Sequence, residues 1–270
     1  MMSAETHTMV LFHAHPDDES IGTGGVMKKA AEEGHRVVLV LATKGEHGEV
    51  DDGFLDPGEA LWQRRVNEVQ AAADILGVSR VEFLGYTDSG MADTPENEKP
   101  DSFWQADVEE AAGRLADILR EEKADILTVY DDNGLYGHPD HIQVHRVGIR
   151  AAELAGTPKL YEATVNRDHM QRIFAMAQEG ALDGEMPEDL TEQSFELGVP
   201  EALITTTVDV RPWLDVKRAA MAAHASQINE TSFFLSMPLE HFELGFGQEW
   251  FILRGAPAGT RETDLFEGLD

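Results

Sequence analysis

Short apolar runs alternate with longer amphipathic segments through the first 165 residues. The apolar runs predict buried strands at 9–13, 36–43, 81–84 and 125–130. The segments between them predict helices at 26–33, 59–76, 106–122 and 139–155. This alternation favours a doubly wound, mostly parallel α/β sheet of Rossmann-like type, with helices on both faces. Long loops at 46–59 and 88–101 follow the second and third strands, where ligands bind in such sheets.

The pattern becomes less regular after residue 165. We expect strands at 205–210 and 248–253 and a helix at 212–225. Residues 182–201 carry acidic side chains without Lys or Arg, which is typical of an exposed insertion. The expected organisation is therefore a Rossmann-like metal-binding core, a smaller irregular C-terminal lobe that completes the fold and pocket, and an acidic tail, at 1–165, 166–254 and 255–270.

Composition narrows the class of protein. Of the 270 residues, 42% are hydrophobic and 27% charged, as in ordinary soluble domains. The net charge of −30 disfavours nucleic acid and anionic membranes as partners. The longest apolar run, 37–42, is far shorter than a membrane span, and the first ten residues lack a signal-peptide pattern. We expect a cytoplasmic protein, and the sequence leaves open whether it forms a homo-oligomer.

The absence of cysteine excludes thiolate zinc sites, so any metal must use His and carboxylate ligands.

Two polar clusters follow predicted strands, at 15–18 (HPDD) and 138–141 (HPDH). Each has a proline at an expected first helical position and polar side chains one turn apart. A single His-Pro-Asp is usually a turn, but two such clusters converge naturally at the carboxyl edge of a parallel sheet. His15, Asp18 and one later histidine would make a zinc site with a position left for water. His141 is the better third ligand because it lies within the first turn, whereas His138 lies at the boundary and is free to face substrate. Other divalent ions such as Fe²⁺ also suit this ligand set.

Four segments, 13–19 (HAHPDDE), 43–49 (TKGEHGE), 88–91 (DSGM) and 136–141 (YGHPDH), resemble the PIG-L/LmbE-type zinc-dependent N-acetylglucosamine de-N-acetylases. Within that family the sequence is most similar to the mycothiol-pathway deacetylase and conjugate amidase branch. The resemblance covers most of the first 165 residues and resumes at 217–228 (KRAAMAAHASQI). The acidic segment between them has no counterpart.

The resemblance implies one zinc per chain, held by His15, Asp18 and His141. It also implies that Asp17 is the general base and that His138 stabilises the oxyanion. The reaction chemistry requires the same residue types. Zinc lowers the pKa of a bound water to about 7, and a carboxylate that is not itself a ligand is needed to take the proton from that water. A protonated His138, held by Asp140, would complete the catalytic set.

Further positions match the family without a settled role. Arg65, Asp88 and Tyr136 resemble residues that contact the sugar or the reacting carbonyl, yet each is also compatible with a helix-face charge, a turn cap or a packed aromatic ring. Glu19 is either a first-turn acid favoured by the helix dipole or a residue that orders the site. His224 either closes over the pocket or packs in the core.

The implied activity is removal of the N-acetyl group from a small, soluble glucosamine-containing molecule such as N-acetylglucosaminyl-inositol. A mycothiol S-conjugate amidase is the alternative within the class. It is weakened because that branch tends to carry a lysine after its Asp-Asp-Glu-Ser segment, where this chain has Ile21-Gly22-Thr23. A non-catalytic sugar- or metal-binding module is the alternative from another class.

Overall fold

The computed structural model describes residues 5–178 and 197–269, and its described strands form one mixed sheet. The strands are β1 Thr8–His13, β2 Arg36–Leu41, β3 Arg80–Phe83, β4 Ile126–Tyr130, β5 Lys159–Thr164, β6 Thr206–Asp209 and β7 Gln248–Leu253. Their order is β3-β2-β1-β4-β5-β7-β6. Strands β1 to β5 pair in parallel, and β7 runs antiparallel to both β5 and β6. The expected mostly parallel α/β fold is confirmed, and the C-terminal strands extend the same sheet.

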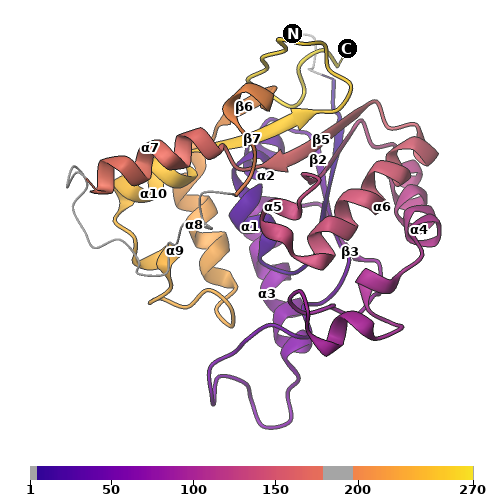
Figure 1. Cartoon of the computed structure of the whole chain (residues 1–270), viewed down its shortest axis with the longest axis vertical. Helices are drawn as coiled ribbons and strands as arrows, with labels where there is room; N and C mark the ends of the chain where they lie inside the picture. The colour runs from indigo at the N-terminus through magenta and orange to yellow at the C-terminus, as the bar shows by residue number, and fades with distance from the viewer. Residues whose placement is uncertain (1–4, 179–196, 270) are drawn as a thin grey trace.

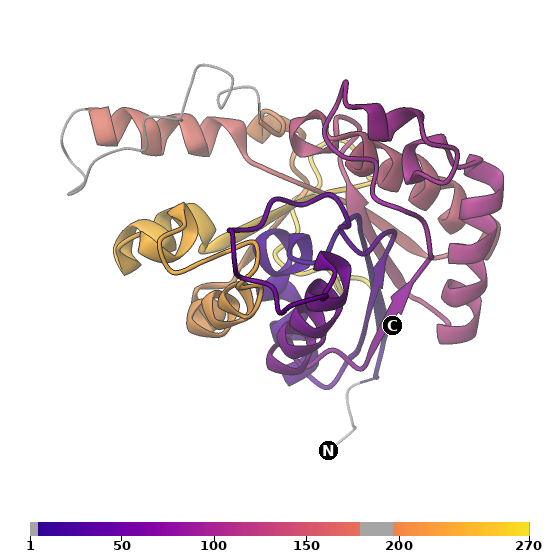
Figure 2. The ribbon, with the colours of Figure 1, turned by 90° about the horizontal axis from the view of Figure 1, so that it is seen from below.

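Helices cover both faces of the sheet (Figure 1 and Figure 2). The α-helices are α1 Asp18–Gly22, α2 Gly24–Glu32, α3 Leu61–Leu76, α4 Val108–Glu122, α5 Gly134–Gly137, α6 Pro139–Ala155, α7 Arg167–Gln178, α8 Leu214–Ala223, α9 Phe233–Ser236 and α10 Leu239–Phe246. Short 3₁₀ helices lie at Pro95–Glu98, Phe103–Gln105, Glu201–Leu203 and Arg211–Trp213. Because successive strand residues point to opposite faces, Val10 and Phe12 pack with α4 and α6, while Met9 and Leu11 pack with α2, α3 and α8.

The loops after β1 and β4 are positioned by the strand order. These two strands are neighbours, with Met9 paired to Ile126 and Leu11 to Thr128, yet the chain continues from them toward opposite ends of the sheet. Connections diverge at such a switch point and leave a crevice at the carboxyl ends of the strands. The residues that follow β1 and β4 therefore meet at one edge.

Strand β5 carries polar residues that obscure it in the sequence. Lys159 Nζ lies 3.0 Å from Glu262, and Glu162 pairs with Arg254 at 2.9 Å. Partners from the C-terminal segment thus compensate the charges of a buried strand. Without those partners, a six-residue segment that contains both a lysine and a glutamate gives no signal of a buried strand.

The C-terminal segment after residue 255, expected as an acidic tail, packs against the sheet. Leu265 is only 2% exposed and belongs to the core on the α2 and α3 face. Glu262 accepts hydrogen bonds from Tyr161 at 2.8 Å and Thr206 at 2.7 Å. Most of the expected acidic insertion, 182–201, lies outside the described residues. Among the helices that the structure describes, none combines the length and apolar character needed to cross a bilayer.

Candidate metal centre

The carboxylate of Asp18 lies between His15 and His141. Its Oδ2 atom is 3.3 Å from His15 Nδ1, and its Oδ1 atom is 3.4 Å from His141 Nε2. The three side chains can offer ligand atoms that all lie within 4.8 Å of one another. His15 follows β1, Asp18 begins α1 and His141 lies in the first turn of α6, so the sheet edge brings both sequence clusters together.

The ligand chemistry fits a divalent metal. Both ring nitrogens of His141 are buried without a hydrogen-bond partner, an expensive arrangement for a polar group unless a ligand takes one of them. Ligands about 2.0–2.2 Å from a tetrahedral zinc ion are separated by about 3.4 Å, and the nitrogens of His15 and His141 lie at 3.3 and 3.4 Å from different oxygens of Asp18. The His141 ring is held in place by stacking on Tyr130, with ring centroids 4.3 Å apart.

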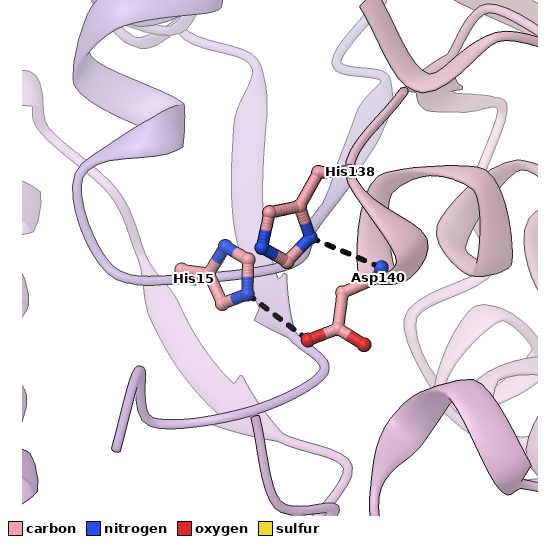
Figure 3. A group of neighbouring side chains, drawn as sticks. All are labelled: His15, His138 and Asp140. Carbon is pink, nitrogen blue, oxygen red and sulfur yellow. Dashed lines mark hydrogen bonds and ion pairs between the residues drawn. The ribbon is translucent and has the colours of Figure 1, made fainter. Parts of the chain in front are cut away.

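Asp140 supports His15. Its Oδ2 atom lies 3.1 Å from His15 Nε2 (Figure 3). The same oxygen accepts a hydrogen bond from the Ser89 backbone N–H at 3.0 Å. The Ser89 hydroxyl donates to Oδ1. A carboxylate on the second nitrogen of a metal-binding histidine fixes which nitrogen faces the metal. This differs from the expectation that the Asp140 carboxylate holds His138, because His15 and Ser89 already occupy it.

His138 contacts Asp140 only through the backbone. The Asp140 N–H donates to His138 Nδ1 at 3.1 Å (Figure 3), so the proton of a neutral ring sits on Nε2. Burial, together with the nearby His15 and His141, lowers the pKa of His138 to about 4. The structure therefore favours a neutral His138 that donates through Nε2–H, in contrast to the protonated ring expected from the sequence.

Asp17 lies beside the ligand set without joining it. Its backbone has φ 116°, in the left-handed region that residues other than glycine rarely adopt. Burial raises the pKa of Asp17 to about 6, although Arg65 at 3.3 Å opposes this shift. A carboxylate with a pKa near neutrality is suited to general base catalysis.

Arg65 is engaged within the protein. Its guanidinium donates to the carbonyls of Gly45 at 2.9 Å and Pro16 at 2.5 Å, and it also faces Asp17. A Cβ at Gly45 would lie 2.0 Å from Arg65 Nη1, which explains a glycine in the 43–49 motif. Arg65 thus joins the loops after β1 and β2 through its two terminal nitrogens, while its Nε is buried without a hydrogen-bond partner.

The other two expected substrate contacts have different surroundings. Asp88 accepts backbone hydrogen bonds from Gly90 at 2.8 Å and His47 at 3.1 Å, so it caps its own turn while lining the cavity. Tyr136 is 50% exposed, and its ring lies 5.0 Å from that of His141. Tyr136 is therefore the more accessible of the two to a substrate.

Tyr130 and His13 are site residues whose roles the sequence did not reveal. His13 Nδ1 lies 2.9 Å from the Tyr130 hydroxyl, and His13 Nε2 lies 2.9 Å from Thr23. Burial lowers the pKa of His13 to about 4. The available signal is the position of His13 at the end of the predicted strand, two residues before His15.

The site opens into a cavity of about 1630 Å³. One part is lined by the polar residues described above. Another part is apolar, and its lining includes Ile173 of α7, Phe233 and Phe234 of α9, and Phe246 of α10. These helices lie on the left in Figure 1.

The sequence matches the family described as PIG-L: GlcNAc-PI de-N-acetylase over residues 10–152. The chain belongs to the PIG-L family. A relative from Acidothermus cellulolyticus, named 1D-myo-inositol 2-acetamido-2-deoxy-alpha-D-glucopyranoside deacetylase, is 43% identical over 97% of this chain and 95% of its own length. The expected PIG-L membership is confirmed, and with it the enzyme class, a hydrolase of carbon–nitrogen bonds other than peptide bonds.

Solved structures extend the comparison to the fold. N,N'-diacetylchitobiose deacetylase from Pyrococcus horikoshii is similar with a TM-score of 0.58 and 22% identity, covering 92% of this chain and 84% of that one. The 4-carboxy-2-hydroxymuconate hydratase from Pseudomonas putida has a TM-score of 0.59 and 20% identity, covering 93% and 98%. Because a hydratase shares this architecture, the PIG-L assignment depends on the sequence relatives and on the site, and not on the fold alone.

Proposed function

We propose that this chain removes the acetyl group from N-acetylglucosaminyl-inositol or a closely similar soluble amino sugar in the cytoplasm. The observation that carries the proposal is the buried His141 imidazole, which has no hydrogen-bond partner and faces Asp18 and His15, with the carboxylate of Asp17 beside them. The name of the 43% identical relative supports the same substrate.

We propose zinc as the metal, held by His15, Asp18 and His141. When bound, such an ion polarises the amide carbonyl and makes water a stronger nucleophile. The same ligand types accept Fe²⁺.

Asp17 takes a proton from the attacking water as the new carbon–oxygen bond forms. The Nε2–H of His138 donates to the carbonyl oxygen as negative charge develops there. Asp17 then returns the proton to the leaving nitrogen, and the carbon–nitrogen bond breaks to give acetate and a free amine. Tyr136 and Asp88 face the sugar, and described residues of the C-terminal part of the chain, among them Phe233 and Phe246, line the rest of the cavity.

The direct test is to incubate the zinc-loaded protein with N-acetylglucosaminyl-inositol and measure acetate and primary amine. Equal amounts of both products are expected. A non-catalytic binding module would give a different result. The parent protein would show no turnover, and the Asp17→Asn variant would bind the sugar as tightly as the parent does.

The apolar part of the cavity favours a mycothiol S-conjugate amidase as a second candidate. A fully polar sugar-inositol leaves Phe233, Phe234 and Phe246 without apolar contacts, whereas a conjugate with an aromatic thiol adduct would cover them. Comparing kcat/KM for a bimane-labelled conjugate and for N-acetylglucosaminyl-inositol separates the two. A higher value for the conjugate would replace the first assignment.

A further inference from the structure

The backbone of Asp17 is held in its unusual conformation by a carboxylate two residues away. The Asp17 N–H donates to Glu19 Oε2 at 2.9 Å. A non-glycine residue with φ 116° persists only where its surroundings determine the conformation. The position of the Asp17 carboxylate therefore depends on the position of Glu19.

Glu19 is itself fixed from a distant part of the chain. Its second oxygen, Oε1, lies 2.7 Å from His224 Nε2 and accepts the Ser20 hydroxyl at 2.7 Å. Both Glu19 and His224 are completely buried. Because a carboxylate only accepts hydrogen bonds, His224 presents its Nε2–H to Glu19.

His224 is anchored independently of Glu19. It is the C-cap residue of α8, a helix that packs on α1, α2 and α3. Two residues later, the backbone N–H and hydroxyl of Ser226 donate to Glu68 on α3, at 2.8 and 2.6 Å. The backbone that carries the imidazole is thus held against α3 without the help of Glu19, while the second ring nitrogen of His224, Nδ1, is buried without a hydrogen-bond partner.

The geometry points to His224 as a positioning residue that acts through Glu19 on Asp17. This inference rests on the proposed function of Asp17 as the base. Simple core packing would not place a polar ring nitrogen 2.7 Å from a buried carboxylate. A helix-dipole role for Glu19 would not direct one oxygen to the Asp17 N–H and the other to α8.

Steady-state kinetics of position 224 variants test the role. His224→Phe keeps the ring volume but removes the donor, so kcat should fall about 10- to 100-fold, as expected for a small displacement of a catalytic group. KM and bound zinc should stay unchanged. His224→Gln carries an amide N–H that can reach Glu19 and should recover most of kcat. His35→Phe, the same substitution at a histidine that accepts a hydrogen bond from the His7 backbone at the opposite edge of the sheet, is the matched control and should retain parental kcat.

A double-mutant cycle with Asp17→Asn separates positioning from structure. If His224 acts only through Asp17, His224→Phe should cause no further loss in the Asp17→Asn background. Should His224→Phe fold poorly by circular dichroism, Glu19→Gln replaces it in the same cycle. Additive losses, or a failure of His224→Gln to recover kcat, would overturn the positioning role while the parent remains active. An inactive parent would instead overturn the proposed function.

Discussion

The carboxylate of Asp140 lies 3.1 Å from the imidazole of His15, although 125 positions separate the two residues in the chain. The contact leaves Nδ1 as the His15 nitrogen that faces Asp18. Asp140 therefore orients the imidazole of His15, one of the three residues proposed to bind the metal.

Asp140→Asn should weaken metal affinity about 10- to 100-fold, the usual effect of losing a carboxylate behind a metal-binding histidine. Titration against a competing chelator measures this change. Asp132→Asn, at an exposed neighbouring position, is the control and should leave affinity unchanged. Equal affinities for the parent and Asp140→Asn would remove Asp140 from the metal centre.

Asp17→Asn should lower kcat about 100- to 10,000-fold, because general base catalysis contributes an effect of that size. Zinc content by elemental analysis should stay at the parental level, since Asp17 lies outside the ligand set. Loss of zinc from this variant would mean that Asp17 is a ligand.

His141→Ala should empty the metal site, because it removes one of the three proposed protein ligands. His138→Ala is the matched comparison. It should keep the metal and lower kcat about 100- to 1,000-fold, as for removal of one oxyanion donor. Metal analysis of the two variants checks the assignment, and the opposite pattern would exchange the roles of the two histidines.

Arg65→Lys should lower kcat by about 10-fold or more with little change in KM. A lysine cannot contact Pro16, Gly45 and Asp17 with a planar fork, so the base becomes less well positioned. Steady-state kinetics on the sugar substrate measure kcat and KM separately. A rise in KM at constant kcat would instead assign Arg65 to substrate binding.

Leu265→Ala should lower the free energy of unfolding by about 2–5 kcal/mol, the range for a buried leucine. The side chain is 2% exposed, whereas that of Leu203 is 57% exposed. Leu203→Ala is therefore the control, with an expected change of no more than about 0.5 kcal/mol. Urea unfolding monitored by circular dichroism compares the two. Equal stabilities would contradict the packing of the C-terminal segment.

Local patterns were sufficient to predict the layered α/β fold. Hydrophobic periodicity and caps depend on neighbouring residues, so α6 at Pro139–Ala155 and β7 at Gln248–Leu253 have the bounds expected from the sequence. Strand β5 was missed as a separate element because Glu262 and Arg254 compensate its charges from far along the chain.

The sequence by itself determined which residues could bind a metal. They lie in two clusters that begin with His-Pro, at 15–18 and 138–141, and each cluster follows a predicted strand. Only the tertiary structure decided the partners of those residues. It directs the Asp140 carboxylate to His15, places Arg65 against Pro16 and Gly45, and connects His224 to Glu19. The physical reason is that hydrogen bonds between side chains depend on distances that folding sets between remote segments, whereas periodicity and turn chemistry operate within a few residues.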